Sequence, residues 1–305
     1  MNFQDNELNR IARLFNQIIN ETYGLDRESL DALSFIPPQT GVGQWLRSWS
    51  YKVISEMGVA KLISDYTEDF PPISRGIELK TNEIREWGLS YGYSEFELMQ
   101  WLTTGIDLSR DEADTARRKI DEKVDEVLFV GDKEANTTGF LNNPNVPLVV
   151  VPTGAGGETK LKGKSLQEIV DTIQAMIDTV RTNTKRTVKA DTILLPHESF
   201  VYLSTTPKDE KGGDLTILEY LQKVFKGQGL VNWRECSKLD EAGIGGATRA
   251  VIYKYSPTVL TRCLPIPFKQ EEPQKNALMY KVPCYCRVGG VAFKNINAVA
   301  YADGV

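Results

Sequence analysis

The strongest hydrophobic pattern in the chain lies between residues 109 and 131. Apolar residues recur there at every third or fourth position, and most of the residues between them are charged. This spacing places an apolar stripe on one side of a helix. At about 1.5 Å per residue, a helix from Arg110 to Phe129 is roughly 30 Å long. We call it the spine helix and expect Ser109 to cap its start and Gly131 to end it. The stripe consists of Ala113, Ala116, Ile120, Val124, Val127 and Leu128.

Two strand-like stretches precede the spine helix, at residues 49–66 and 75–93. In the second stretch, apolar side chains share one period-two phase at both ends, but Glu83 and Arg85 interrupt that phase in the middle. This pattern favours a two-stranded ribbon over residues 48–92 that is rooted in a domain and projects outward. The alternative is a hairpin inside an ordinary sheet. A ribbon of two strands is marginal alone, so it needs contact with another protein.

The first 47 residues form a predicted N-terminal arm. Apolar residues at helical spacing mark a short amphipathic helix over residues 6–21, and a stretch rich in proline and glycine follows. Such an arm cannot form a core alone, so its apolar side needs a surface on its own domain or on a neighbouring copy. The apolar residues are Leu8, Ile11, Phe15, Ile18 and Ile19.

The remaining elements predict a second, inserted domain. A short helix after residue 94 is expected to bury Phe96, Met99 and either Trp101 or Leu102 before Gly105 ends it. From about residue 146 to 262, short strands alternate with helices, including a helix from Leu166 to Arg181, which indicates a compact α/β unit. Residues 263–305 alternate like paired strands and are expected to return to the sheet beside the spine helix. The fold class is therefore α+β, with a peripheral domain over residues 93–145 and an inserted domain over residues 146–262.

Composition limits the classes of function. With 305 residues the chain is long enough for about two domains, and 41% apolar and 25% charged residues are ordinary for a globular protein. No apolar run approaches the roughly 18 to 20 residues of a membrane span. The first ten residues carry acids where a secretory signal carries basic residues, so we expect an intracellular product without membrane association.

The charge balance disfavours a dedicated nucleic-acid binder. There are 36 basic and 41 acidic residues, and no basic tail is present at either end. We expect the protein to enclose DNA rather than to bind it through a dedicated site.

The residues most suited to chemistry do not form a catalytic or metal-binding pattern. The four cysteines lack metal-ligand spacing and are expected to be reduced structural thiols. His197 is the single histidine and has no Gly-x-Ser-x-Gly motif and no cysteine nearby in sequence. Acids of the spine helix alternate with bases as on a solvated face, although Glu122 and Glu126 form a like-charge pair that a cation from another subunit would relieve. We therefore expect no catalytic residue, no cofactor and no metal.

A glycine-rich loop offers the main alternative of another class, a soluble α/β enzyme that binds a nucleotide through residues Gly154 to Ser165. A phosphate-binding P-loop needs a glycine five positions before its Gly-Lys-Ser, and that position holds Glu158. A carboxylate there repels phosphates. Ser165 and Glu168 instead have the spacing of a capping box that starts a helix.

Three phrases carry a resemblance to a known family: ARRKIDEKVDEVLFVGD with the TTGFLNNPNVP that follows, YTEDFPPI, and YGYSEFELMQW. Together they resemble major capsid proteins of tailed bacteriophages, in particular a group that carries a domain of unknown function and has the Hong Kong 97-type fold. The resemblance is most specific from about Trp49 to Pro147. It implies an N-terminal arm, an extended loop formed by the ribbon, a peripheral domain with the spine helix, an inserted axial domain and return strands over residues 263–305.

The resemblance also implies a structural function. Copies of the chain would form pentamers and hexamers of an icosahedral shell around double-stranded DNA, made in the host cytoplasm, with scaffolding, portal or decoration proteins as further partners. An encapsulin-type compartment is the alternative within the same fold. The residues that we expect at subunit interfaces are Phe15, Ile18, Glu83, Arg85, Arg117, Arg118, Glu122 and Glu126.

Overall fold

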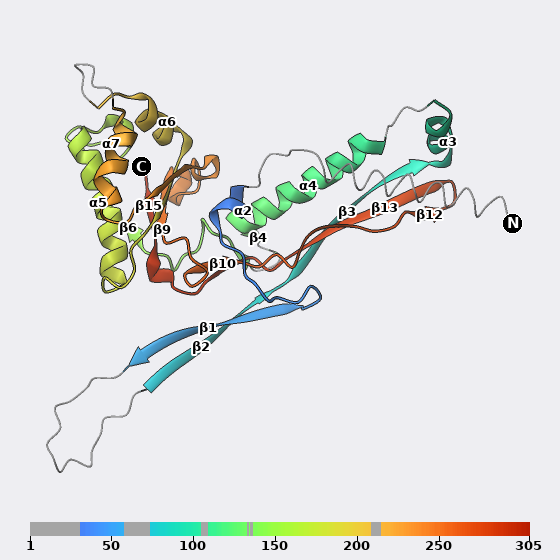
Figure 1. Ribbon diagram of the computed structural model, residues 1–305, viewed down its shortest axis with the longest axis horizontal. Helices are drawn as coiled ribbons and strands as arrows, with labels where there is room; N and C mark the ends of the chain where they lie inside the picture. Colours follow the sequence, from blue (N-terminus) through green and yellow to red (C-terminus); the bar gives the residue numbers. More distant parts are fainter. Residues whose placement is uncertain (1–30, 58–73, 105–108, 133, 135–136, 209–214) are drawn as a thin grey trace, which may run out of the picture. The chain divides into compact units, whose positions relative to one another are not determined.

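The computed structural model describes residues 31–57, 74–104, 109–132, 134, 137–208 and 215–305. The chain divides into two compact units. Unit 1 comprises the chain up to Arg47 together with Glu83–Phe140 and Arg262–Gly290. Unit 2 comprises Ser48–Asn82, Leu141–Thr261 and Val291–Val305. Each unit is therefore assembled from segments that lie far apart in the sequence (Figure 1).

Unit 1 consists of a four-stranded sheet under a long helix. The central strand β13 (Met279–Val288) pairs antiparallel with β3 (Arg85–Ser94) on one side, and with β11 (Ile266–Gln270) and β12 (Gln274–Asn276) on the other. The helix α4 (Ser109–Phe129) lies along β3 and β13 (Figure 1). This helix is the predicted spine helix, and all six residues of its predicted apolar stripe are buried.

Four further short elements belong to the described part of unit 1. Helix α2 (Asp31–Phe35) contacts α4, and α3 (Glu95–Thr104) directly follows β3. After α4, the short strands β4 (Gly131–Asp132) and β5 (Thr137–Thr138) form a tight hairpin. Gly131 has a φ of 82°, and a Cβ there would lie 2.2 Å from the carbonyl oxygen of Thr137, so only glycine fits this helix end.

Unit 2 combines strands and helices, as predicted for residues 146–262, and it also includes Ser48–Asn82 and Val291–Val305. Its five-stranded sheet has the order β6-β15-β9-β7-β8, with β6 (Leu148–Val149), β7 (Thr192–Leu195), β8 (Asn232–Glu235), β9 (Arg249–Tyr253) and β15 (Val299–Asp303). The helices are α5 (Leu166–Asn183), α6 (His197–Thr205) and α7 (Ile217–Lys226). Their order along the chain and the types of the elements agree with the sequence prediction.

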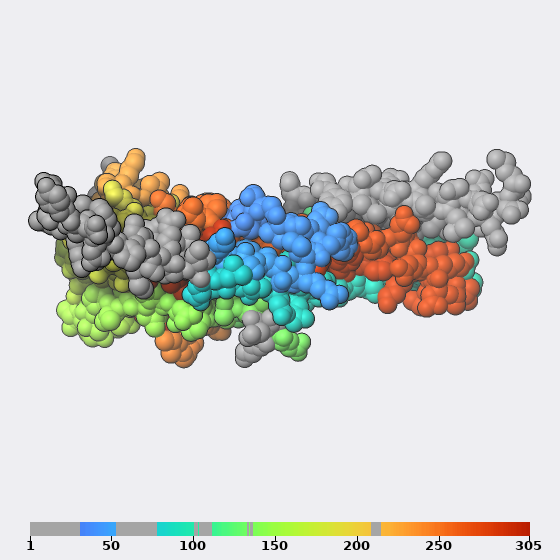
Figure 2. Space-filling model, turned by 90° about the horizontal axis from the view of Figure 1, so that it is seen from below, coloured from blue at the N-terminus to red at the C-terminus, as the bar shows by residue number. Residues whose placement is uncertain are grey.

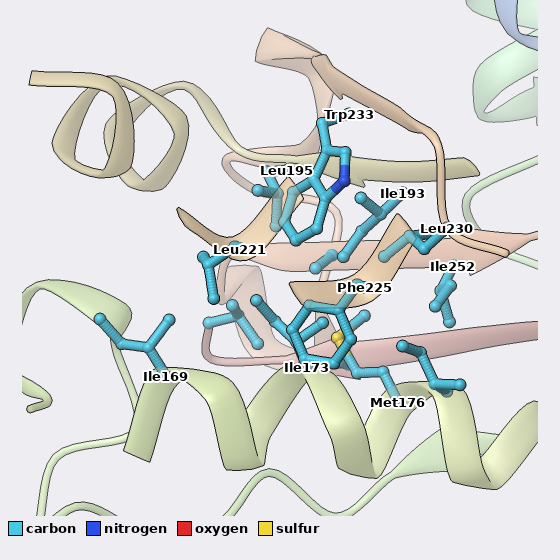
Figure 3. Packing of buried hydrophobic residues seen from close by; sticks show 14 of the residues in the cluster. Ile169, Ile173, Met176, Ile193, Leu195, Leu221, Phe225, Leu230, Trp233 and Ile252 are labelled. Atoms are coloured by element: carbon cyan, nitrogen blue, oxygen red, sulfur yellow. The ribbon is translucent and has the colours of Figure 1, made fainter. Parts of the chain in front are cut away.

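The core of unit 2 lies between α5, α7 and the sheet. Figure 3 shows Ile169, Ile173 and Met176 of α5 directed toward Phe225 of α7 and Trp233 of β8. The Phe225 and Trp233 rings are 6.3 Å apart between centroids. Burying such side chains contributes about 1.5–3 kcal/mol each, so this cluster gives unit 2 a core of its own.

The second strand-like stretch of the sequence, residues 75–93, proves to be two strands. Strand β2 (Ser74–Glu83) pairs only with β1 (Ser48–Met57) and makes a two-stranded ribbon, whereas β3 pairs with β13 in the sheet of unit 1. The division falls at Ile84, which is buried and donates its amide to the carbonyl of Arg47 at 2.8 Å. The polar interruption at Glu83 and Arg85 therefore marks the junction of two strands.

Two further expectations need correction. Residues 263–305 do not all return to the sheet beside the spine helix, because β15 lies inside the sheet of unit 2, where four of its five residues are buried. The expectation that α3 buries Phe96 and Met99 is also wrong. Among the side chains of α3 that the structure describes, Leu98 is buried whereas Phe96 and Met99 are exposed, so the inner side of this helix is one residue out of phase with the predicted one.

Candidate assembly surfaces

One side of the spine helix is buried, and another side carries ion pairs. Along the ion-paired side, Lys119 contacts Glu122 at 2.8 Å and Lys123 contacts Glu126 at 3.2 Å. Each glutamate therefore already has a cation three residues earlier on the same helix. Most of these groups are well exposed, so each ion pair contributes at most about 1 kcal/mol. This side is available for contacts with another protein.

A buried carboxylate on the same helix fixes the start of the described chain. Asp125 is only 9% exposed, and its Oδ1 accepts a hydrogen bond of 3.0 Å from the backbone amide of Ala32. The neighbouring Phe35 packs its ring 6.2 Å from that of Phe129. Helix α2 is thus attached to the C-terminal half of α4 by one charged hydrogen bond and by apolar packing.

Two arginines hold the segment that follows α2. The Arg262 guanidinium donates to the carbonyl of Leu33 at 2.8 Å and also to that of Ile36. The Arg287 guanidinium, which is buried, donates to the carbonyls of Gln44 and Leu46 and pairs with Glu86 at 2.8 Å. A guanidinium group carries five N–H donors in a rigid plane, so one arginine can donate hydrogen bonds to several carbonyls. The end of the N-terminal arm is therefore bound at two places, by Arg262 at the end of β10 (Leu260–Arg262) and by Arg287 on β13 of the unit 1 sheet.

The ribbon of β1 and β2 has a defined root within unit 2. Asn82 donates its side-chain amide to the carbonyl of Val291 at 3.3 Å, next to strand β14 (Val291–Phe293). The Tyr51 hydroxyl hydrogen-bonds to the backbone of Phe293, and burial followed by the charge of Glu78 raises the pKa of that phenol. Farther along, the Ser50 and Thr81 hydroxyls lie 2.8 Å apart across the strands. These bonds attach the base of the ribbon to β14.

An apolar patch lies at the end of unit 1 where α3 meets the turn between β12 and β13. Phe96 is 73% exposed, Leu278 and Met279 are each 55% exposed, and Met99 is 40% exposed. The Glu95 amide donates to the carbonyl of Leu278 at 2.8 Å, so the start of α3 lies beside the β12–β13 turn. We call these four residues the α3 patch. Large apolar side chains gathered on a surface are typical of a site for protein contact.

The side of the unit 1 sheet that faces away from α4 is partly exposed. Figure 2 shows this side, with the orange-red atoms of β11 to β13 not covered by the spine helix. Along β13, Met279 and Lys281 are exposed while Tyr280 and Val282, which alternate with them, are buried. The facing positions on β3 are small, with Gly92 opposite Lys281 and Ser94 opposite Met279. The sheet is therefore exposed on this side near the start of β13, whereas the segment around Trp45 covers the same side at Arg287, 5.6 Å from the Trp45 ring.

The glycine-rich loop of unit 2 does not have the geometry of a phosphate site. The Glu168 carboxylate accepts hydrogen bonds from the amides of Ala155 and Ser165, both at 2.7 Å, and these are groups that a phosphate would need. The ammonium of Lys164 is buried and donates to the hydroxyl of Thr172 at 2.9 Å instead of pointing into the loop. The predicted capping box of Ser165 and Glu168 is present. This loop is a helix cap.

The other residues with reactive side chains have structural surroundings. All four cysteines are buried and free, and burial raises the pKa of Cys284 and Cys286 to about 11. His197 is exposed and bonded to Glu235. Within the described ranges, no three His, Cys, Asp or Glu side chains group as metal ligands would. Among the described helices, none is both long enough and apolar enough to cross a membrane.

Comparison with known proteins identifies the family. The sequence model of the family described as "Major capsid protein" matches residues 58–305, which is most of the chain. The chain belongs to the major capsid protein family. No match was found among curated proteins.

Solved structures agree with this family assignment at the level of the fold. The capsid of Myoviridae phage XM1 matches with a TM-score of 0.75 and 19% identity, over 92% of this chain and 94% of that chain. A structure from Mycobacterium phage Adephagia matches with a TM-score of 0.62 and 13% identity, over 91% of each chain. A virus-like particle from Pyrococcus furiosus matches with a TM-score of 0.54 and 12% identity, over 94% and 96%. The α+β fold of this major capsid protein is therefore the Hong Kong 97-type capsid fold, as expected from its sequence.

The residues expected at subunit interfaces lie in different surroundings in this capsid protein. Glu83 and Arg85 form an exposed ion pair at the junction of β2 and β3. Arg118 is exposed on α4, whereas Arg117 is partly buried, 3.7 Å from Asp121 and stacked over the ring of Phe268 at 5.3 Å. Phe15 and Ile18 lie outside the described residues. The positions of these residues at interfaces stay predictions.

Sequence reasoning missed the buried polar residues that hold the arm. Asp125 lies next to the apolar stripe and was counted with the solvated acids of the spine helix. Arg287 follows the alternating stretch VPCYC and shares the phase of Pro283 and Tyr285, which is the less apolar of the two phases, so the pattern does not predict its burial. Both are buried because their partners, backbone groups of residues 32–46, come from a distant part of the chain. No local pattern records such a partner.

Proposed function

We propose that this major capsid protein assembles into pentamers and hexamers of an icosahedral shell that encloses double-stranded DNA. The family match over residues 58–305 carries the proposal, because it covers both compact units, and the fold agrees with it. The role is structural, as a component of the virion. We place its synthesis in the host cytoplasm, with scaffolding, portal and decoration proteins as further partners.

The energetics of a shell fit the surfaces described above. Individual contacts of an ion-paired helix side, an apolar patch and a ribbon are modest. A closed shell repeats each of them many times, so the assembly is far more stable than any single interface. Enclosure of DNA needs no dedicated basic site, and this agrees with a net charge of −5.

The first experiment is electron microscopy of the purified full-length protein. We expect closed shells, or rings of five and six copies that close when assembly conditions are supplied. A protein that stays monomeric under all such conditions would refute the proposal. Shells formed around a resident enzyme instead of DNA would favour the encapsulin-type alternative, and nuclease-protected DNA inside shells would exclude it.

Charge reversal tests the interface residues. We propose that Glu83 and Arg85 contact a sister copy, as do Arg117, Arg118, Glu122 and Glu126 on the spine helix. The single changes Glu83→Arg and Arg85→Glu should lower shell yield. The double reversal restores the local ion pair, so recovery of shells in the double variant would assign the effect to the pair itself and not to the interface.

Glu122 and Glu126 need a different control. Their cations Lys119 and Lys123 are on the same helix, so relief of repulsion no longer requires a second subunit. The proposal for these two residues depends on their exposure alone. Glu122→Lys should reduce assembly without changing the thermal stability of the subunit, whereas an equal loss of both would mean that the residue acts only within its own chain.

For Phe15 and Ile18 we propose a contact with a sister copy in the finished shell. The sequence pattern supports this, because an apolar stripe on a short helix needs a partner surface. Replacing both residues with aspartate should reduce shell yield while leaving the folding of the subunit unchanged, as judged by thermal unfolding.

A further inference from the structure

One end of unit 2 collects basic side chains from three segments of the chain. The last turn of α5 carries one cation, the last turn of α7 carries two, and the turn that follows α5 carries three more. Five of the six side chains are exposed, and Arg181 is half-buried. We call these six residues the α5–α7 basic cluster: Arg181, Lys185, Arg186, Lys189, Lys223 and Lys226.

Backbone and side-chain contacts bring the three segments together. The Arg181 guanidinium donates to the carbonyl of Gln228, on the loop after α7, at 3.2 Å. On the same loop, a Cβ at Gly229 would lie 3.5 Å from the Cβ of Lys189. The Arg186 amide donates to the carbonyl of Arg181 at 2.7 Å and closes the turn after α5. The cluster is therefore one continuous surface of unit 2.

The charges of the cluster are not neutralised by carboxylates of the same chain. Within the ranges that the structure describes, none of the six cations forms an ion pair. The two acids that flank the turn after α5 have other partners. Asp178 accepts a hydrogen bond from the side chain of Gln174 at 2.9 Å, and Asp191 accepts one from the amide of Tyr255 at 2.7 Å. The cluster therefore has an excess of positive charge.

Two of the cations have backbone conformations that suit other residues. Lys185 and Arg186 have φ values of 51° and 64°, in the left-handed region where glycine and asparagine are favoured. Backbone strain of this kind is concentrated at sites that have a function. Because the strain would be smaller without these long side chains, it indicates that their charges have a role beyond folding.

The chemistry of the cluster fits the phosphate backbone of a nucleic acid. Four of the six residues are lysines, which are depleted in protein–protein interfaces, whereas contacts to phosphates use lysine and arginine and are independent of base sequence. The formal net charge of −5 does not prevent such contacts. At 0.1 M salt, exposed charges more than about 10 Å apart are largely screened, so the local charge of the cluster dominates.

We propose that the α5–α7 basic cluster contacts the phosphates of the double-stranded DNA inside the shell, without reading its sequence. This inference rests on the proposed function and adds to it the surface of the subunit that meets the DNA. Enclosure does not depend on the cluster. The cluster gives the enclosed DNA a point of contact on each subunit.

DNA binding by the full-length, unassembled protein tests the proposal. Fluorescence anisotropy follows a labelled duplex of about 24 base pairs and arbitrary sequence from about 50 to 200 mM salt. The variant Lys185→Asn with Arg186→Asn should bind about tenfold more weakly at the lowest salt, and its slope of log affinity against log salt should be smaller by about 2. Asparagine suits the left-handed conformation, so thermal stability should not fall. Weaker binding is then not a result of unfolding.

The matched control is Lys160→Asn with Lys162→Asn. These two lysines belong to the same unit and are exposed, but they pair with Glu198 at 3.8 and 3.6 Å. We expect the control to change the affinity by less than about twofold.

The outcomes separate this inference from the proposed function. Equal effects of the two variants, or no binding by the wild-type protein, would overturn the inference. Normal DNA binding by the Lys185→Asn, Arg186→Asn variant together with a lower yield of DNA-free shells would also overturn it, because the cluster would then contact a sister copy. Shell formation by the unmodified protein is scored separately by electron microscopy, so the capsid role can stand when the DNA contact fails.

Discussion

Asp125 of the spine helix and Ala32 of α2 are joined by a hydrogen bond of 3.0 Å, although 93 residues separate them in the sequence. The carboxylate is buried, and the amide belongs to a helix of five residues, which is too short to be stable alone. The bond therefore fixes the start of α2 against the spine helix.

Removing this acceptor should loosen the arm. We expect Asp125→Ala to lower the free energy of unfolding by about 1–3 kcal/mol, because the Ala32 amide loses a charged partner. Hydrogen exchange of the amides of residues 32–36 should rise well above that of the rest of unit 1. Urea unfolding and exchange mass spectrometry measure the two effects. The exposed Glu122→Ala is the control and should cost less than about 1 kcal/mol; an equal loss in both variants would show that the bond does not hold the arm.

How far the sequence predicts this structure depends on the range of the interactions. The spine helix, the helices of unit 2 and the capping box at Ser165 depend on neighbours within four residues, so periodicity and spacing are sufficient to predict them. The strand β3 was predicted as part of the ribbon because alternation is the same in a ribbon and in a sheet. Its pairing with β13 joins residues nearly 200 positions apart, which no local pattern contains.

The errors at α3 and β15 have the same origin. In α3, three of the first five residues are apolar, so two different sides of the helix fit the pattern, and the contact with β3 decides between them. In β15, Val299, Ala300, Tyr301 and Ala302 are buried on both sides of the sheet, a pattern that fits either unit. The interface residues are a harder problem, since the surroundings that would reveal them belong to other copies of the chain.

Gly92 should tolerate no side chain. A Cβ at this position would lie 2.8 Å from the carbonyl oxygen of Tyr280 on the paired strand β13, and a backbone atom cannot move aside without disturbing the ladder. We expect Gly92→Ala to lower the free energy of unfolding by about 1–3 kcal/mol. Gly156→Ala is the matched control, because nothing lies within 4 Å of a Cβ there. Chemical denaturation of both variants provides the comparison, and a tolerated Gly92→Ala would mean that β3 and β13 separate more easily than their continuous register implies.

The loop from Gly154 to Ser165 should behave as a helix cap in solution. Ser165→Ala removes the hydroxyl that accepts a hydrogen bond from the Glu168 amide, so we expect the free energy of unfolding to fall by about 1 kcal/mol. Ser165→Gly should lower it by less. Calorimetric titration of the wild-type protein with ATP and magnesium should give no binding heat, and Lys164→Ala should leave that result unchanged. Saturable binding that Lys164→Ala abolishes would instead support a nucleotide site.

The ion pair of His197 and Glu235 should make one local contribution to stability depend on pH. The hydrogen bond to Glu235 and the charge of that carboxylate raise the pKa of His197 above its ordinary value of 6.5. A raised folded-state pKa means that the pair stabilises the fold fully below pH 6.5 and loses this contribution as the pH rises through the raised pKa. The protein has a single histidine, so its ring protons can be followed by NMR without assignment of other histidines. We expect Glu235→Gln to shift the His197 titration to lower pH and to reduce stability at pH 5.5 but not at pH 9, whereas an unchanged titration would show that the two side chains do not pair in solution.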